Sequence, residues 1–215
     1  MTILEIYNKY KINKGLQEHM IRVAAVAKVI CDNSNTKLDT RNIVVGCLVH
    51  DMGNLIKSKM DMMPELFGPE GVAYWSKVKE EMIEEYGNDV HVATIRMVTE
   101  MNLTKESLFY FSAIGGDDTG RVHSEGTLGE KIATYSDMRI GLHGVISLKE
   151  RMDDIRHRYI ERNMKGFNSD DIDLREERLI DMENDIFKNS SIQPEDITDE
   201  TTRDIQKALW NWEIV

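Results

Sequence analysis

Helical periodicity runs through almost the whole chain and constrains the fold more than any other feature. Apolar residues recur at helical spacing in segment after segment, and only three prolines interrupt the 215 residues. We find no internal repeat and no segment that supports a β-strand. A chain of this length buries a sizeable core without disulfides, so we expect residues 1–215 to form one all-α domain.

Capping signals and turn residues divide the chain into expected helices. The first clear helix runs from about Lys14 to Cys31, and the second starts near Asp39 and runs into His50. Capping boxes over residues 127–130 and 147–150 predict two further helix starts. The remaining helices are expected over residues 70–86, 89–101, 105–114, 127–142, 147–162, 170–188 and 199–212. Residues 115–120 are expected to form a loop.

The acidic composition excludes some partners. The formal net charge is -11, whereas non-specific binding to nucleic acid needs a basic face, so a nucleic-acid polymer is not expected as a partner. Residues 161–200 hold 13 acidic against 5 basic residues, so an anionic substrate elsewhere on the molecule is not excluded. No stretch approaches the length of a membrane span, and both cysteines sit in apolar helical runs. We therefore expect a cytoplasmic protein with no membrane partner, and a homo-oligomer stays open.

The pair His50-Asp51 is the first candidate for chemistry. It follows the apolar run 43–49, where burial of an imidazole and a carboxylate is unfavourable unless something compensates for their lost hydration. A divalent metal ion is the usual compensation, because imidazole nitrogen and carboxylate oxygen are both good ligands. His19 upstream and Asp137 downstream, each on its own expected helix, are candidate partners of this pair. Arg22 follows His19 by one turn on the same helical face, where a guanidinium is suited to bind an anion.

With their flanking residues, these positions resemble the HD-domain superfamily of metal-dependent phosphohydrolases. The matching motifs are His-Met-Ile-Arg-Val-Ala at 19–24, Val-His-Asp-Met-Gly at 49–53 and Ser-Asp-Met-Arg at 136–139. The resemblance covers about residues 14–160, which would form the HD core of the helical bundle. It leaves about residues 161–215 as a C-terminal helical extension.

The resemblance implies a metal-dependent hydrolase whose divalent ion would be Mn, Mg, Co, Ni, Zn or Fe. The implied ligands of this ion are His19, His50, Asp51 and Asp137. Water activated by the ion attacks a small phosphate ester, such as a nucleotide, which is the expected partner of the chain. The catalytic candidates are His50, Asp51 and Arg22, with Arg22 in contact with the phosphate. Further candidates for contact with an anion are Lys57, Lys59, Arg139 and Arg151.

A second metal ion depends on two more residues. His91 resembles the third histidine region of the family's binuclear members, in which Asp51 bridges the two ions. Those members place a fourth histidine in the loop before the Asp137 helix, but here Asp117 stands about there. Asp117 suits a harder ion such as Mn²⁺ or Mg²⁺, and His123 is another replacement. The alternative is that Asp117 caps a turn and that the site holds one metal ion.

Two other functions stay open at this point. One is an HD-fold oxygenase in which two irons activate O₂, and this reading needs the complete binuclear site. The other is a degenerate HD domain that binds a nucleotide or a protein without turnover. The intact set of four expected ligands argues against the second alternative.

Overall fold

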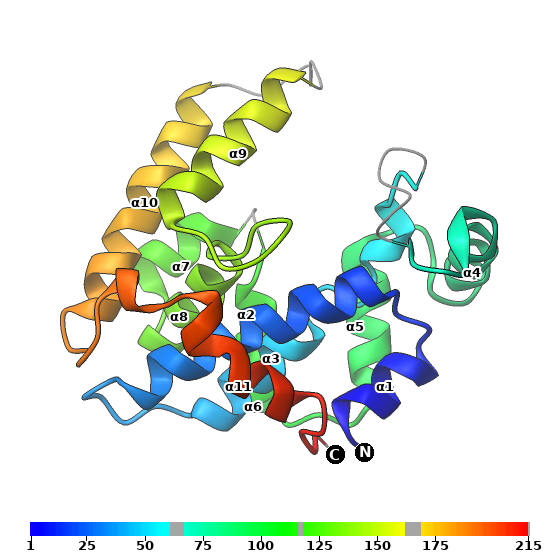
Figure 1. The fold of residues 1–215 in the computed structure, drawn as a ribbon, viewed down its shortest axis with the longest axis horizontal. Helices are drawn as coiled ribbons and strands as arrows, with labels where there is room; N and C mark the ends of the chain where they lie inside the picture. Colours follow the sequence, from blue (N-terminus) through cyan, green and yellow to red (C-terminus); the bar gives the residue numbers. More distant parts are fainter. Residues whose placement is uncertain (61–66, 116–117, 162–168, 215) are drawn as a thin grey trace.

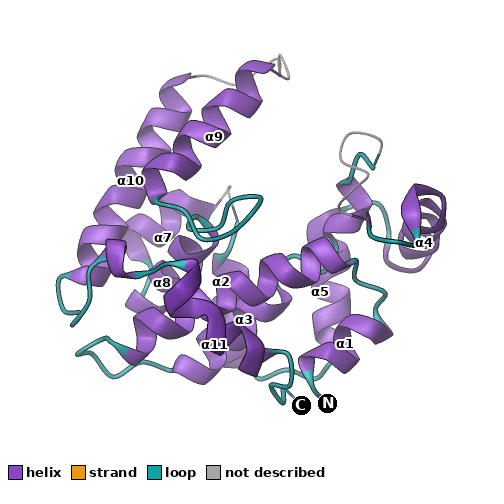
Figure 2. Ribbon diagram, in the orientation of Figure 1, coloured by secondary structure: helices purple, strands orange, loops and turns teal. Residues whose placement is uncertain are grey.

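The computed structural model describes residues 1–60, 67–115, 118–161 and 169–214, and these are helical almost throughout (Figures 1 and 2). Within these ranges there is no strand, only three isolated β-bridges. The expected all-α class is confirmed. The helices are α1 (Ile3–Lys9), α2 (Lys14–Asp32), α3 (Thr40–Val49), η1 (Asn54–Lys57), α4 (Gly71–Tyr86), α5 (Val90–Glu100), α6 (Lys105–Ala113), α7 (Thr119–Glu125), α8 (Leu128–Asp137), α9 (Leu148–Glu161), α10 (Ser169–Phe187), η4 (Pro194–Asp196) and α11 (Asp199–Leu209).

Local capping explains where several helices begin and end. The side chain of Asn13 accepts a hydrogen bond from the backbone N–H of Leu16 and so starts α2. Thr127 and Glu130 form the expected capping box at α8, in which the backbone N–H of each donates to the side chain of the other. Gly87 ends α4 with φ of 92°, a conformation that residues with a Cβ rarely adopt. These boundaries follow directly from the local sequence.

Three helix boundaries differ from the expectation. Helix α1 was not expected, although a capping box marks its first turn. Helix α7 begins inside residues 115–120, which were expected to be a loop. Helix α8 ends at Asp137 and does not continue to Leu142. The chain folds back there, because the backbone N–H of Ile146 donates to the carbonyl of Arg139 at 2.8 Å.

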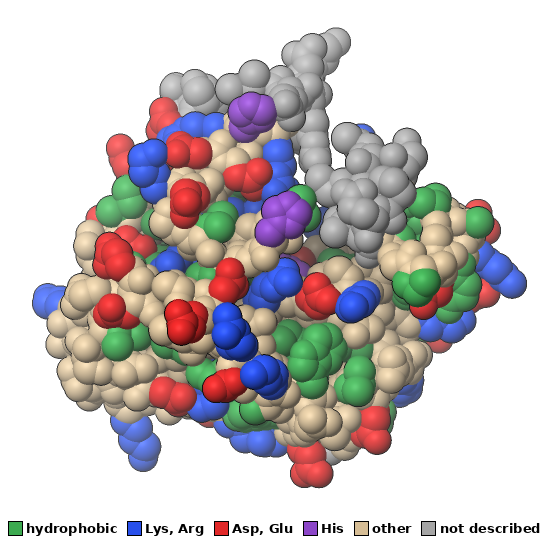
Figure 3. Space-filling model, in the orientation of Figure 1, with side chains coloured by type: hydrophobic (Ala, Val, Ile, Leu, Met, Phe, Trp, Pro, Cys, Tyr) green, Lys and Arg blue, Asp and Glu red, His purple; other side chains and the backbone are tan. Residues whose placement is uncertain are grey.

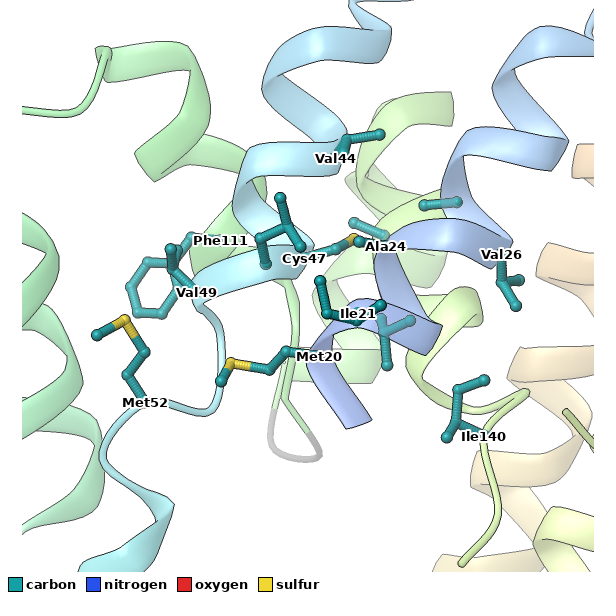
Figure 4. Packing of buried hydrophobic residues seen from close by; sticks show 14 of the residues in the cluster. Met20, Ile21, Ala24, Val26, Val44, Cys47, Val49, Met52, Phe111 and Ile140 are labelled. Atoms are coloured by element: carbon teal, nitrogen blue, oxygen red, sulfur yellow. The ribbon is translucent and has the colours of Figure 1, made fainter. Parts of the chain in front are cut away.

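Helices α2 and α3 pack side by side in the core and carry two of the candidate motifs. Figure 4 shows Ala24 of α2 and Cys47 of α3 facing one another between the two helices, and both side chains are 0% exposed. On its other side α3 lies directly against α6, since a Cβ added to Gly46 would lie 2.8 Å from the backbone nitrogen of Phe111. This tight packing holds the carboxyl end of α3, where His50 lies, in a fixed place.

The C-terminal elements complete the bundle. Helices α9 and α10 lie side by side, α10 also packs against α7 and α8, and α11 lies across α2 (Figure 1). Ile197 and Leu209 belong to the same buried hydrophobic cluster as α2 and α3. The two termini meet, because the backbone N–H of Ile3 donates to the carbonyl of Trp212 at 2.9 Å (Figure 1). Among the described helices, none is long and apolar enough to cross a membrane.

Candidate metal centre

Two helix ends and one helix interior bring the four expected metal ligands together. His19 lies in the second turn of α2, Asp137 is the last residue of α8, and His50 caps the carboxyl end of α3 with Asp51 next to it. The His50 side chain is 3% exposed, whereas those of the other three are 22–25% exposed. The cluster therefore has a buried histidine at its base and three side chains that reach solvent.

The distances within the cluster suit a single metal ion. The Nε2 atom of His19 lies 3.1 Å from Asp137 Oδ1 and 3.6 Å from Asp51 Oδ2. The Nε2 atom of His50 lies 3.6 Å from the same two carboxylate oxygens. Two ligands that each bind an ion at about 2.1 Å lie roughly 3.0–3.4 Å apart, so only small movements are needed to coordinate one. One donor atom each from His19, His50 and Asp51 also lie within 4.8 Å of one another.

The orientation of His50 is fixed by a hydrogen bond on the far side of its ring. Its Nδ1 lies 2.8 Å from the carbonyl oxygen of Cys47, and a carbonyl only accepts, so Nδ1 carries the proton. The Nε2 atom points at the two carboxylates, is buried, and has no hydrogen-bond partner among the described residues. A buried polar atom without a partner is unfavourable, and a metal ion would satisfy it. The residues present therefore fit a divalent metal ion.

The electrostatics of the cluster agree with this arrangement. Burial lowers the pKa of the His50 imidazole, but the charges of Asp51 and Asp137 outweigh burial and raise this pKa to about 9. Burial raises the pKa of the Asp137 carboxyl, but its contacts with His19 and His50 outweigh burial and leave that pKa well below its usual range. Asp137 is therefore an anion at neutral pH, as a ligand must be. Without a metal ion, His50 is protonated at neutral pH, and its positive charge faces the carboxylates of Asp51 and Asp137.

The cluster lies in the wall of a cavity of about 480 Å³. Arg22 also lines this cavity, together with the four expected ligands. Arg22 forms an ion pair with Glu18. The distance from Nη2 of Arg22 to Oε2 of Glu18 is 3.5 Å, which is long for a charge-assisted hydrogen bond. Acidic and basic side chains are interspersed over the face of the molecule that Figure 3 shows. The cavity itself is lined by four basic and three acidic side chains, so the net charge of the whole chain does not describe the local charge there.

Of the expected ligands of a second metal, neither His91 nor His123 lines the cavity or belongs to the group of described side chains that could hold an ion. His91 is exposed on α5, and its ring stacks on that of Phe111 at 6.3 Å between centroids. His123, on α7, lies 3.0 Å from Asp181 of α10 and does not line the cavity. Asp117 lies outside the described residues. The binuclear site stays a prediction without support from the geometry of His91.

The other basic residues considered as anion contacts differ in whether they line the cavity. Lys57 and Arg151 line the cavity, whereas Lys59 is exposed and does not line it. Arg139 is 3% exposed and its guanidinium donates to three backbone carbonyls, so it is a structural residue and not an anion contact. Sequence reasoning missed Arg158, which also lines the cavity. Its spacing of seven residues from Arg151 on a predicted helix was the signal that could have found it.

Comparison with known proteins identifies one family. The sequence profile of the HD domain matches residues 16–161, which is more than half of the chain. Neither the curated proteins nor the solved structures include a match to this chain. The matched region contains all four residues of the cluster and ends at the last residue of α9.

Proposed function

Because this chain belongs to the HD-domain family, whose members bind divalent metal ions, we propose that it is a metal-dependent phosphohydrolase that cleaves a small phosphate ester, such as a nucleotide. The observation that carries this proposal is the buried Nε2 atom of His50, which lies 3.6 Å from two carboxylates and has no hydrogen-bond partner among the described residues. The residues that form this cluster are the same ones that carry the motifs of the HD-domain family.

Each residue of the site has a distinct task in this proposal. A divalent ion bound here would lower the pKa of water and offset the negative charge on the phosphoryl oxygens. His50 and Asp51 hold the ion from the end of α3, and Cys47 keeps the His50 ring in the required tautomer. Arg22 binds the phosphate. Its contact with Glu18 is long, at 3.5 Å, so a phosphate can form shorter hydrogen bonds with the guanidinium.

The dimensions of the cavity favour a small substrate. Its volume of about 480 Å³ falls within the usual range for small-molecule sites, which is about 300–1,000 Å³. His19, Asp51 and Asp137 are 22–25% exposed, so a substrate reaches them without rearrangement of the core. The four-ligand cluster and Arg22 line the same cavity, which suits a phosphate placed between cation and guanidinium.

The test is phosphate release from a panel of nucleotides and other phosphomonoesters, with Mn²⁺, Mg²⁺, Co²⁺ or Ni²⁺ added. We expect activity that EDTA abolishes and that His50→Ala and Asp51→Ala reduce to background. Arg22→Gln should raise KM, since it removes a contact to the phosphate. His123→Ala is the matched control, because His123 pairs with Asp181 away from the cavity. Activity that survives both His50→Ala and Asp51→Ala would refute the proposal.

A further inference from the structure

Helix α9 presents two arginines to the cavity from one helical face. Arg151 and Arg158 both line the cavity, and they are seven residues apart, which is close to two full turns. At about 1.5 Å per residue their Cα atoms are roughly 10 Å apart along the helix axis. They therefore form an extended basic wall and not a single point of charge.

Asp154 holds both arginines in place. Its Oδ2 lies 3.3 Å from Nη1 of Arg151, and its Oδ1 accepts from Nε of Arg158 at 2.9 Å. One carboxylate thus compensates two guanidinium groups and leaves one positive charge in excess. The Nε of Arg151 is also buried and has no hydrogen-bond partner among the described residues. Two arginines that share one carboxylate have capacity for a second anion.

The opposite face of α9 has a different role. Arg156 pairs with Asp173 at 2.8 Å and also with Glu176, both on α10, and it does not line the cavity. These ion pairs attach α9 to α10, so the position of the basic wall does not depend on a ligand. Arg156 therefore differs from its neighbours on α9 in function, although all three are arginines on one helix.

The charges around the cavity are divided between the metal cluster and α9. Four cationic side chains line it (Arg22, Lys57, Arg151 and Arg158), against three carboxylates (Glu18, Asp51 and Asp137). A divalent ion on the His19 cluster adds two positive charges, and Asp154, which pairs with both arginines of α9, adds a fourth carboxylate. The site then has two positive charges in excess, one at the metal cluster and one on α9. A phosphate bound at the metal cluster therefore leaves the positive charge on α9 for a second anion.

We propose that Arg151 and Arg158 form a second anion subsite, which binds a second phosphoryl group of the substrate. The substrate class is then a small molecule with two separated phosphoryl groups, one at the metal cluster beside Arg22 and the other along α9. This inference rests on the proposed function, because the first subsite is the one described there. It adds a residue set that neither the HD motifs nor their spacing indicate.

The experiment compares two probes whose C–P bonds are not hydrolysed by phosphoesterases. Butylphosphonate carries one anionic group, and tetramethylene bisphosphonate carries two on the same alkyl chain. Isothermal titration into the Mn²⁺-loaded protein should show the bisphosphonate binding about tenfold or more tightly. Arg151→Gln and Arg158→Gln should each reduce that ratio, and the double variant should bring it close to one. Binding of butylphosphonate should be unchanged in all three.

Two control variants separate this subsite from general effects of charge. Arg156→Gln removes the same charge from the same helix outside the cavity and should preserve the ratio of affinities. Arg22→Gln should weaken both probes to a similar extent. A ratio near one in the wild-type protein, or a ratio that persists in the Arg151 and Arg158 double variant, would overturn the second subsite alone. No binding of butylphosphonate to the metal-loaded protein would overturn the proposed function and the subsite with it.

Discussion

Substitution of Gly53 by alanine tests whether the segment after Asp51 is held against α5. Gly53 has an ordinary helical backbone conformation, so a side chain is excluded only by its neighbours. A Cβ there would lie 2.6 Å from Thr94 Oγ1 and 2.6 Å from the carbonyl oxygen of Val90. Ordinary contact begins at 3.4 Å, so the segment must move by about 0.8 Å. The carbonyl belongs to the first turn of α5 and does not rotate away.

The size of the effect follows from these contacts. Overpacking of a rigid site costs about 1–3 kcal/mol of folding free energy. The buried hydrogen bond from Gly53 N–H to Thr94 Oγ1, now 3.0 Å, would be lengthened or lost at a cost of about 1 kcal/mol. Alanine also restricts the backbone of the unfolded chain more than glycine does, which stabilises the folded protein by about 0.4–1 kcal/mol. We expect Gly53→Ala to reduce the free energy of unfolding by about 2–3 kcal/mol.

Thermal unfolding followed by circular dichroism measures this loss. For a chain of this size the expected decrease in Tm is roughly 4–12 °C. Affinity for Mn²⁺ should also fall, because the same segment carries Asp51. Gly115→Ala is the matched control: Gly115 lines the cavity, but a Cβ there meets nothing within 4 Å. Gly53→Ala with a Tm within 1 °C of the wild-type value would refute the reasoning.

Two further predictions concern His50 and Arg139. The pKa of His50 is about 9, so at neutral pH a metal ion must displace a proton from its imidazole. Affinity for Mn²⁺ should therefore rise about tenfold per pH unit between about pH 6 and 8. Titration calorimetry that shows no pH dependence of this affinity would contradict the prediction. Without metal, this raised pKa stabilises the folded protein below the unfolded value near 6.5 and the contribution is lost as pH rises through about 9. Arg139→Met removes a donor from the carbonyls of Ile146, Pro194 and Ile197, of which Pro194 keeps a second partner in the backbone N–H of Ile197. Urea unfolding should therefore show a loss of roughly 3–5 kcal/mol of folding free energy, and a loss below about 1 kcal/mol would contradict the structural role of Arg139.

Local sequence signals predict most of the helices and the four side chains that come together in the cluster. The Thr127 capping box, the glycine stop at residue 87 and the helix from Lys14 all follow from interactions within a few residues, and the structure confirms them. The four expected ligands also converge, because each lies at a helix position that the motif context defines. His19 and Asp137, more than a hundred positions apart in the chain, come within 3.1 Å of one another.

Tertiary contacts account for what the sequence does not predict. The end of α8 depends on the chain folding back from Ile146 to Arg139. Gly141 and Gly144 mark a turn, but they do not show that the helix already ends at Asp137. Arg139 lies two positions after Asp137 and so suggests a phosphate contact, but its guanidinium is buried and donates to distant carbonyls, including that of Pro194. Arg158 faces the cavity, whereas Arg156 pairs with α10 from the other side of α9. The periodicity of α9 shows that it has two faces but not which neighbour each face meets.

We propose that His19, His50, Asp51 and Asp137 hold one divalent ion at the wall of the cavity. Crystals grown with Mn²⁺ and metal analysis of the purified protein would locate and count this ion. We expect one anomalous scattering peak among these four side chains and one ion per chain. His50→Ala and Asp137→Ala should weaken binding by more than about 100-fold. A protein without bound metal, or a peak located away from these four residues, would contradict it.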